Sequence, residues 1–249
     1  MKIKQFIRKQ SSYTVVQLLM TVVSVLGIFF GKDNAVILSI ACSVLASAIV
    51  GLFTVFFLFQ EDENKEIVKH WGLTNIYRSR SEMNKDCDVD LNKAREHVDY
   101  VGFGFRSLRD TKDDDVRQKV SQGVKFRFLV MDPESPFLKE REKEESCAPD
   151  EIRKSIRDLE KWVRNINEKN RDNPVELKYY SSLPLDYYNR IDNVVYMGPY
   201  WYGKTSQHTV SYKFTADSEG FNLYTEYFEK LWKDSDLSRD ALISPKKRK

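Results

Sequence analysis

Two long apolar runs occupy the start of the chain, at about residues 11–31 and 34–60, and only Lys32 and Asp33 separate them. A helix that crosses a bilayer needs about 20 apolar residues, because its backbone finds no water in hydrocarbon and must bond within the helix. The pattern therefore predicts a transmembrane hairpin of two antiparallel spans. A secretory signal peptide is the alternative for the first run, but no small-x-small cleavage site follows it and a second run begins at once.

The charges that flank the runs predict their orientation, because basic residues near span ends are held on the cytoplasmic side. The turn carries only Lys32, which Asp33 offsets. We therefore expect an inner (plasma) membrane protein with both termini in the cytoplasm and the lipid bilayer as a partner. The basic residues on the outer sides of the runs are Lys2, Lys4, Arg8, Lys9, Lys65 and Lys69.

Small side chains recur at every fourth position of the second run, and the first run has a shorter counterpart. Small residues let two helices approach closely, and such contact is a main source of helix association in lipid. The stripe predicts helix packing, either between the two spans of one chain or between subunits of a homo-oligomer. Its members are Ala35, Ser39, Ser43, Ser47 and Gly51, with Gly27 and Gly31 in the first run.

The hydrophilic remainder of the chain alternates between strand and helix patterns. Helical segments separate the first three strands, whereas the last strands follow one another directly, which predicts an α/β domain with a mixed sheet. We expect strands at 98–104, 124–131, 175–181, 192–198 and 208–214, and helices at 113–122, 138–146, 149–170 and 221–232.

The domain organisation follows from these patterns. Residues 1–60 form the membrane hairpin, 61–90 a juxtamembrane helix and linker, 91–235 the α/β domain, and 236–249 a basic tail. Within the linker we expect a helix over about 61–82, followed by an acidic loop.

Charge and cysteine usage exclude some functions. The net charge is +3, but the terminal segments hold the basic excess and leave the body of the domain acidic. Because duplex-binding domains normally present a basic face, no duplex nucleic acid is expected as a partner. The three cysteines, Cys42, Cys87 and Cys147, match no metal-ligand spacing, so we predict no metal site and no cofactor.

Three phrases stand out in the domain: HVDYVGFGFRSL, GVKFRFLVMDPESPF and RIDNVVYMGPYWYG. Together with the order of elements, they resemble one half of the phospholipase D superfamily, in particular its catalytically degenerate bacterial branch. The resemblance covers about residues 91–232. It implies a single phospholipase-D-like α/β domain with a mixed sheet flanked by helices.

Active members of that superfamily carry His-x-Lys, with an Asp five residues after the Lys. The His attacks phosphorus and the Lys neutralises phosphate charge. Asp192 and Gly198 lie where the resemblance places the family's Asp and Gly, but residues 183–190 contain neither His nor Lys. We therefore predict a pseudoenzyme without catalytic residues. A displaced site around His208 and Lys213 is the alternative, although the two would point to opposite faces of a strand.

Basic and aromatic residues gather in the loops that such a sheet would bring together. Guanidinium groups and aromatic faces suit a phosphate-bearing ligand or a nucleotide. The alternative is that Arg106 and Arg190 only pair with nearby carboxylates as scaffolding. The candidate ligand-binding residues are Arg106, Ser107, Arg109, Arg190, Asp192, Tyr200, Tyr202, Lys204 and His208.

Together these features predict a membrane-anchored sensor or effector whose domain binds a phosphate-bearing ligand, or a partner protein encoded nearby, and acts through the two spans. The layout resembles bacterial two-transmembrane antiphage effectors, which implies a role in defence by membrane disruption. A membrane-bound phosphodiesterase or nuclease with relocated catalytic residues is the alternative.

Overall fold

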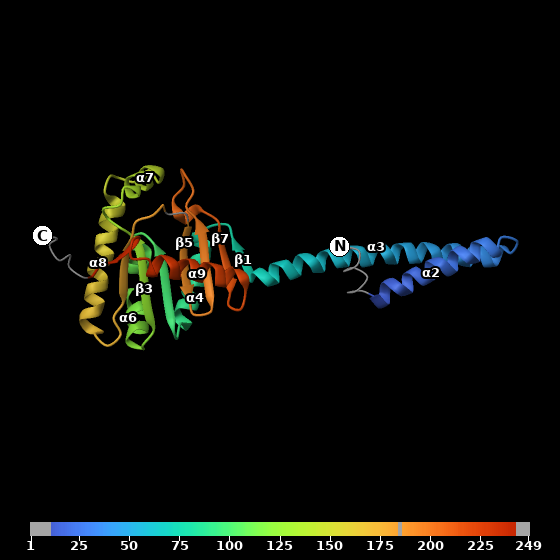
Figure 1. The fold of residues 1–249 in the computed structure, drawn as a ribbon, viewed down its shortest axis with the longest axis horizontal. Helices are drawn as coiled ribbons and strands as arrows, with labels where there is room; N and C mark the ends of the chain where they lie inside the picture. The colour runs from blue at the N-terminus through green and yellow to red at the C-terminus, as the bar shows by residue number, and fades with distance from the viewer. Residues whose placement is uncertain (1–10, 184–185, 243–249) are drawn as a thin grey trace. The chain divides into compact units, whose positions relative to one another are not determined.

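The computed structural model describes residues 11–183 and 186–242 (Figure 1). The chain divides into two compact units, Met1–Val68 and Lys69–Lys249. The basic residues of 1–9 and of the tail 246–249 lie outside the described residues, and the predicted orientation stays a prediction.

The first unit contains helix α2 (Ser11–Phe30) and most of helix α3 (Ala35–Trp71). Asn34 begins α3, because its side-chain oxygen accepts hydrogen bonds from the backbone N–H of Val36 and Ile37 at 3.0 and 3.3 Å. Within α3, residues Ala35–Thr54 are long and apolar enough to cross a membrane, whereas the apolar part of α2, Val15–Phe30, is shorter. One span thus meets the length requirement, and the two-span hairpin stays a prediction.

The contact between α2 and α3 uses only part of the predicted stripe. A Cβ at Gly27 would lie 3.1 Å from the Cβ of Ala41, and one at Gly51 would lie 2.6 Å from the Gln17 amide. Gly31 is also buried, at the turn. The other four members of the stripe, Ala35, Ser39, Ser43 and Ser47, are exposed on α3. Packing within one hairpin therefore does not explain these four positions, and a homo-oligomer contact stays a prediction for them.

A pair of substitutions separates the two faces of α3. We expect Gly51→Leu to destabilise the hairpin by about 1–3 kcal/mol, because the new side chain would collide with Gln17. Ser47→Leu should leave the hairpin intact, since Ser47 is exposed and leucine is at home in lipid. Thermal unfolding of the monomer in detergent measures both, and equal tolerance would contradict the observed contact.

The second unit is built on one eight-stranded sheet. Its order is β1-β7-β6-β5-β2-β3-β4-β8. β2, β3 and β4 run parallel, and every other neighbouring pair is antiparallel, which confirms the predicted mixed sheet. The strands are β1 (Leu73–Tyr77), β2 (His97–Gly102), β3 (Lys125–Met131), β4 (Glu176–Tyr180), β5 (Asp186–Ile191), β6 (Val194–Pro199), β7 (Ser211–Thr215) and β8 (Ser238–Asp240).

Helices cover both faces of this sheet, and α9 crosses the face turned to the viewer in Figure 1. Side chains alternate between the faces, as a strand requires. Phe128 of β3 packs against Trp162 of α8, whereas Arg127 beside it lies over Phe228 of α9. The helices are α4 (Arg80–Lys93), α5 (Arg106–Thr111), α6 (Asp113–Ser121), α7 (Phe137–Glu144), α8 (Glu151–Lys169) and α9 (Glu219–Lys233), with the 3-10 turn η1 (Ser206–His208).

The structure corrects the predicted linker. The juxtamembrane helix ends at Trp71, and Leu73–Tyr77, expected to be helical, forms β1 against β7. The acidic stretch that follows was expected to be a loop but lies in α4. There Asp86 accepts a hydrogen bond from Tyr77, and Asp90 accepts from Tyr196 and Lys213. Tertiary partners therefore hold these carboxylates in a helix that the local sequence does not favour.

Four shorter elements, β5, β8, α5 and η1, were also missed or misplaced. The strands β5 and β8 and the helix α5 were not expected, and His208 lies in η1 rather than at the start of a strand. Asp150 precedes α8, but its side chain makes no capping bond and instead pairs with Arg153 at 2.9 Å.

Candidate functional site

A cavity of about 650 Å³ opens beside the carboxyl end of β2. One face of α4, the segment from Phe103 to Lys112, the start of α8 and the loop before η1 form its walls. Phe105, at its edge, has a left-handed φ of 44°. Such conformations are uncommon outside glycine and often occur at functional sites.

Four buried polar atoms of residues that line this cavity have no hydrogen-bond partner among the described residues. They are Arg80 Nε, the Tyr100 hydroxyl, Asn189 Oδ1 and the Tyr200 hydroxyl. Most buried polar groups in proteins are paired, because an unpaired one costs about 1–3 kcal/mol. Four such groups around one cavity are typical of a binding site that offers its own hydrogen bonds to a ligand.

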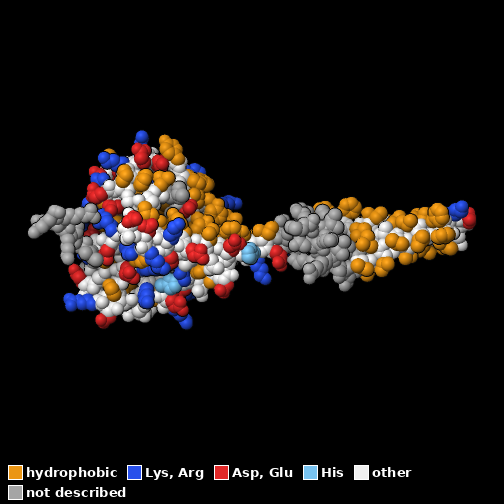
Figure 2. Space-filling model, in the orientation of Figure 1, with side chains coloured by type: hydrophobic (Ala, Val, Ile, Leu, Met, Phe, Trp, Pro, Cys, Tyr) orange, Lys and Arg blue, Asp and Glu red, His pale blue; other side chains and the backbone are white. Residues whose placement is uncertain are grey.

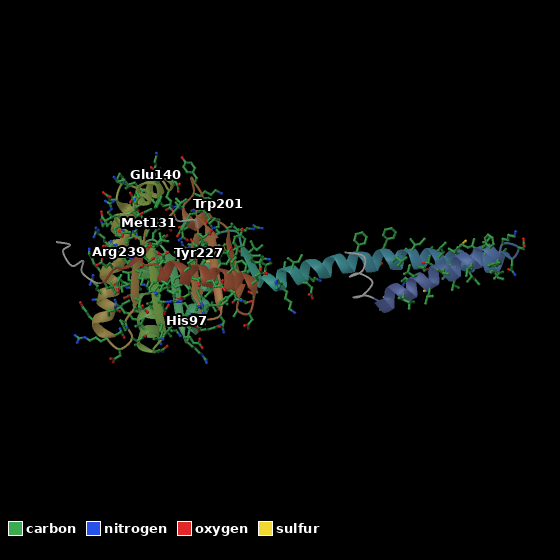
Figure 3. The ribbon with its side chains drawn as sticks, in the orientation of Figure 1. His97, Met131, Glu140, Trp201, Tyr227 and Arg239 are labelled. Atoms are coloured by element: carbon green, nitrogen blue, oxygen red, sulfur yellow. The ribbon has the colours of Figure 1, made fainter. Side chains whose placement is uncertain are left out.

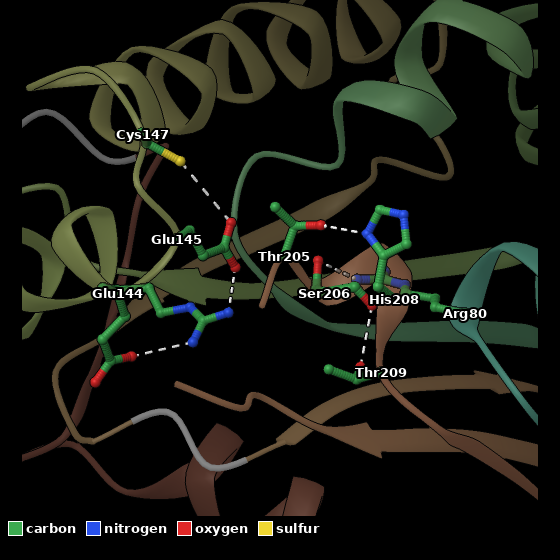
Figure 4. A network of polar contacts seen from close by, with 9 residues as sticks. Arg80, Glu144, Glu145, Cys147, Thr205, Ser206, His208 and Thr209 are labelled. Atoms are coloured by element: carbon green, nitrogen blue, oxygen red, sulfur yellow. Dashed lines mark hydrogen bonds and ion pairs between the residues drawn. The ribbon is translucent and has the colours of Figure 1, made fainter. Parts of the chain in front are cut away.

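Arg80 is held at the cavity by the start of α4. Ser79 caps the helix by accepting from the backbone N–H of Glu82 at 3.2 Å, and the Glu82 carboxylate accepts from Arg78 N at 3.0 Å. The Arg80 guanidinium lies 4.2 Å from the centre of the Tyr187 ring, and its Nη1 is 3.5 Å from Ser206 Oγ (Figure 4). No carboxylate of the described residues pairs with it.

The two tyrosine hydroxyls are neutral hydrogen-bond donors. Burial raises the pKa of Tyr100 and of Tyr200 above the usual range of the phenol. Tyr100 packs against Phe105 with ring centres 5.3 Å apart, and Tyr200 packs against Phe103 at 5.0 Å. These rings give the cavity an aromatic wall.

The cavity lining carries five basic residues and five carboxylates, but not all of the basic residues are paired. Arg109 bonds only uncharged groups, Gly104 O at 2.9 Å and Ser155 Oγ at 3.3 Å. Like Arg80 and Arg109, Lys154 has no carboxylate partner among the described residues. Each lining carboxylate, in contrast, already has a partner: Asp88 with Lys112, Asp110 with Arg106, Glu145 with Arg141, Asp158 with Lys161, and Glu151 with the backbone N–H of Ala148. Arg80, Arg109 and Lys154 are therefore the lining cations with which an anionic group could pair.

The cavity offers no activated nucleophile among the residues that line it. Burial raises the pKa of Cys87 to about 12, and burial together with Glu145 raises that of Cys147, so both stay protonated thiols. The histidines lie elsewhere. His70 pairs with Glu219 at 2.8 Å, His97 begins β2, and His208 bonds Thr205.

The structure brings four of the predicted ligand-binding residues to this cavity: Arg106, Ser107, Arg109 and Tyr200. The other loop residues do not line it. Tyr202 and Lys204 are exposed in a turn, and Nδ1 of His208 lies 2.8 Å from Thr205 Oγ1, as Figure 4 shows. The predicted pairing of Arg106 is also observed, at 3.5 Å from Asp110 on the protein surface.

Arg190 and Asp192 lie at the opposite end of the sheet. Because β5 runs antiparallel to β2, its last residues meet the start of β2, close to His97 in Figure 3. Arg190 Nε donates to the backbone oxygen of Asp192 at 3.0 Å. The Asp192 carboxylate accepts from the backbone N–H of Arg95, Glu96 and His97 at 2.8, 3.0 and 2.9 Å. The structure thus gives both residues a scaffolding arrangement away from the cavity.

Asp192→Asn tests this arrangement. Burial acts to raise the carboxyl pKa, but the three backbone donors outweigh it and the pKa is lowered. The charged form therefore adds stability above the unfolded-state pKa, and that stability is lost as pH falls through the folded-state pKa. We expect a loss of about 1–2 kcal/mol at neutral pH. Urea unfolding should show this difference disappearing in acid, and a constant difference would contradict it.

Sequence reasoning missed Arg80, Tyr100, Asn189 and Lys154. The pattern Ser79-x-x-Glu82 is a capping box, which could have placed Arg80 at the start of a helix. No local signal marks the other three. The positions of Tyr100 and Asn189 depend on strand pairing, and that of Lys154 depends on where α8 packs. In the part of the chain that the structure describes, no group of three or more His, Cys, Asp or Glu could hold a metal ion.

No protein-family model and no curated protein matches the chain. Its fold is similar to that of Nuc from Salmonella typhimurium, a phospholipase D family member, at 9% identity and a TM-score of 0.42, over 67% of this chain and 97% of that one. Phosphatidylserine synthase of Haemophilus influenzae is 9% identical with a TM-score of 0.47, and the match covers 70% of this chain and 40% of that one. TrmBL2, an archaeal chromatin protein, is 13% identical with a TM-score of 0.43, and the match covers 77% of this chain and 67% of that one. Likeness at this level assigns neither a family nor an activity.

Proposed function

We propose that the chain is a membrane-anchored sensor or effector whose second unit binds a phosphate-bearing ligand without hydrolysing it. The observation that carries this proposal is the set of four unpartnered buried polar atoms at one cavity, of which Arg80 is the charged member. Three lining cations without a carboxylate partner among the described residues, Arg80, Arg109 and Lys154, support an anionic ligand.

Phosphate suits the donors of the cavity. A phosphate group accepts several hydrogen bonds at once, and arginine binds it with two parallel N–H groups. Arg80 Nε, Tyr100 and Tyr200 supply donors, while Phe103 and Phe105 supply faces on which a base could stack. A nucleotide combines both features, so nucleotides are the first ligands to test.

Chain connectivity supports a route from the cavity to the apolar helix. α3 ends at Trp71, β1 begins at Leu73, and Arg80 is the first residue of α4. Gly72 joins α3 to β1 with a φ of 67° and lies so close to Ser218 that a side chain would collide there. A ligand that binds Arg80 would therefore act on the start of α4, which the short segment 72–79 joins to the end of α3. By resemblance to two-transmembrane antiphage effectors, we extend the proposal to defence by membrane disruption.

The test uses the full-length protein in nanodiscs, with a panel of ribonucleotides and inorganic pyrophosphate as probes. We expect at least one probe to raise the thermal midpoint, and bis(p-nitrophenyl) phosphate to stay uncleaved. Cleavage that His208→Ala abolishes would contradict the proposal. It would favour the alternative, a membrane-bound phosphodiesterase or nuclease with relocated catalytic residues.

A further inference from the structure

A tight turn projects from the domain between β6 and η1. The backbone N–H of Lys204 is 3.4 Å from the carbonyl of Trp201, which closes a four-residue turn with Tyr202 and Gly203 in the middle. Gly203 has a φ of 71°, a conformation that favours glycine at the third position of a turn. A Cβ at Gly203 would meet no atom within 4 Å, so the tip of the turn stands in open space.

The turn exposes large aromatic side chains. Tyr202 is 83% exposed and Trp201 is 44% exposed. The Lys204 amino group lies 5.3 Å from the centre of the Trp201 ring. Figure 3 places Trp201 at the rim of the domain, at the end of the sheet away from His97. In Figure 2, hydrophobic atoms gather on the visible face of the domain toward this end.

This combination of side chains matches the chemistry of a membrane–water interface. Tryptophan and tyrosine are enriched there, because each has an apolar ring and a polar group that stays hydrated. Lysine near them can reach anionic headgroups, which is worth about 1 kcal/mol per basic residue. Residues 199–208 contain Lys204 and no Asp or Glu, so no acidic side chain of the segment opposes such a contact.

We propose that the turn Trp201–Lys204 docks on the surface of an anionic phospholipid bilayer, with the two aromatic rings in the headgroup layer. A projecting tip needs no shaped partner, because headgroups rearrange around it. The proposal rests on membrane insertion of the apolar helix, which would keep the domain at a high effective concentration near lipid. Docking of the turn is a second, separate contact with the bilayer.

The experiment measures the fluorescence of Trp201 in the full-length protein. Wild type and Trp201→Phe are placed in nanodiscs of phosphatidylcholine and phosphatidylglycerol, with and without brominated acyl chains. Subtracting the two spectra isolates Trp201 from the other three tryptophans. We expect bromine to lower this component by about twofold, because interfacial rings lie near the acyl chains. An unchanged Trp201 component would overturn the proposal.

Trp232→Phe supplies the matched control. Trp232 is in the same domain but is only 6% exposed and packs against Phe228, so its component should keep its intensity in brominated discs. Lys204→Glu tests the charge: it should reduce quenching of Trp201 in discs with phosphatidylglycerol but not in discs of phosphatidylcholine alone. Equal quenching of Trp201 in wild type and in Lys204→Glu, in both kinds of disc, would contradict the requirement for anionic lipid.

The outcomes separate this proposal from the proposed function. Failure of the full chain to enter nanodiscs would overturn both membrane contacts. Entry with an unquenched Trp201, together with ligand binding at the cavity, would overturn only docking of the turn. Concentration-dependent crosslinking through the turn, with no quenching of Trp201, would assign this surface to a second copy of the chain. That result would also overturn docking of the turn on the bilayer.

Discussion

Arg80→Ala is expected to weaken binding of the phosphate-bearing ligand by about thirty- to a hundredfold, which corresponds to about 2–3 kcal/mol for a charge-assisted hydrogen bond. Arg80 is the lining cation whose buried Nε has no partner, and no carboxylate of the described residues competes for it. Isothermal titration of the full-length protein with the best nucleotide from the panel measures the loss.

Two further variants make this test specific. Arg78→Ala removes the same charge two residues earlier, on an exposed side chain that does not line the cavity, and should bind almost as wild type does. Arg80→Lys keeps the charge but loses the planar fork, so we expect an intermediate affinity. Equal losses in Arg78→Ala and Arg80→Ala would mean that overall charge, rather than the cavity, attracts the ligand.

Arg127→Ala is expected to destabilise the second unit by about 3–5 kcal/mol, because it leaves a buried carboxylate without its partner. Asp99 is fully buried in β2 and accepts from Arg127 Nε at 2.6 Å and from Nη2 at 2.8 Å. Arg127 also pairs with Glu229 at 2.7 Å and lies over the rings of Phe228 and Trp232. This cluster therefore joins β2 and β3 to α9. Urea unfolding of the full-length protein, followed by tryptophan fluorescence, measures the loss.

The double variant Asp99→Leu/Arg127→Met is the control for this prediction. It removes both charges and replaces them with apolar side chains, so it should recover much of the stability that Arg127→Ala loses. If the double variant is as unstable as the single one, the loss comes from packing over α9 rather than from the isolated carboxylate.

The sequence alone predicts those features that depend on local pattern. The apolar runs predict helices at residues 11–31 and 34–60, and the structure forms α2 and α3 there. The amphipathic spacing around Ile156 and Leu159 predicts α8, and both residues are fully buried. A nearly unbroken apolar run likewise predicts β3, and turn residues on both sides of residues 175–181 predict β4.

The predicted stripe of small residues shows what a local pattern does not predict, namely which face of a helix packs against its neighbour. Spacing every four residues correctly groups Ser39, Ser43 and Ser47 on one side of a helix, but it does not say which side α2 will cover. In the structure α2 packs on the face with Ala41 and Ala48, and the serines stay exposed. The choice depends on how the shapes of two helices fit, which no single helix encodes.

The candidate site was decided almost entirely by tertiary structure. Arg190 and Asp192 looked like members of the site, but antiparallel pairing of β5 with β2 carries them to the opposite end of the sheet. The same pairing sets Asn189 of β5 opposite Tyr100 of β2, where both side chains line the cavity that Arg80 reaches from α4. Strand direction and register arise from hydrogen bonds between residues about ninety positions apart, and composition and spacing do not specify them.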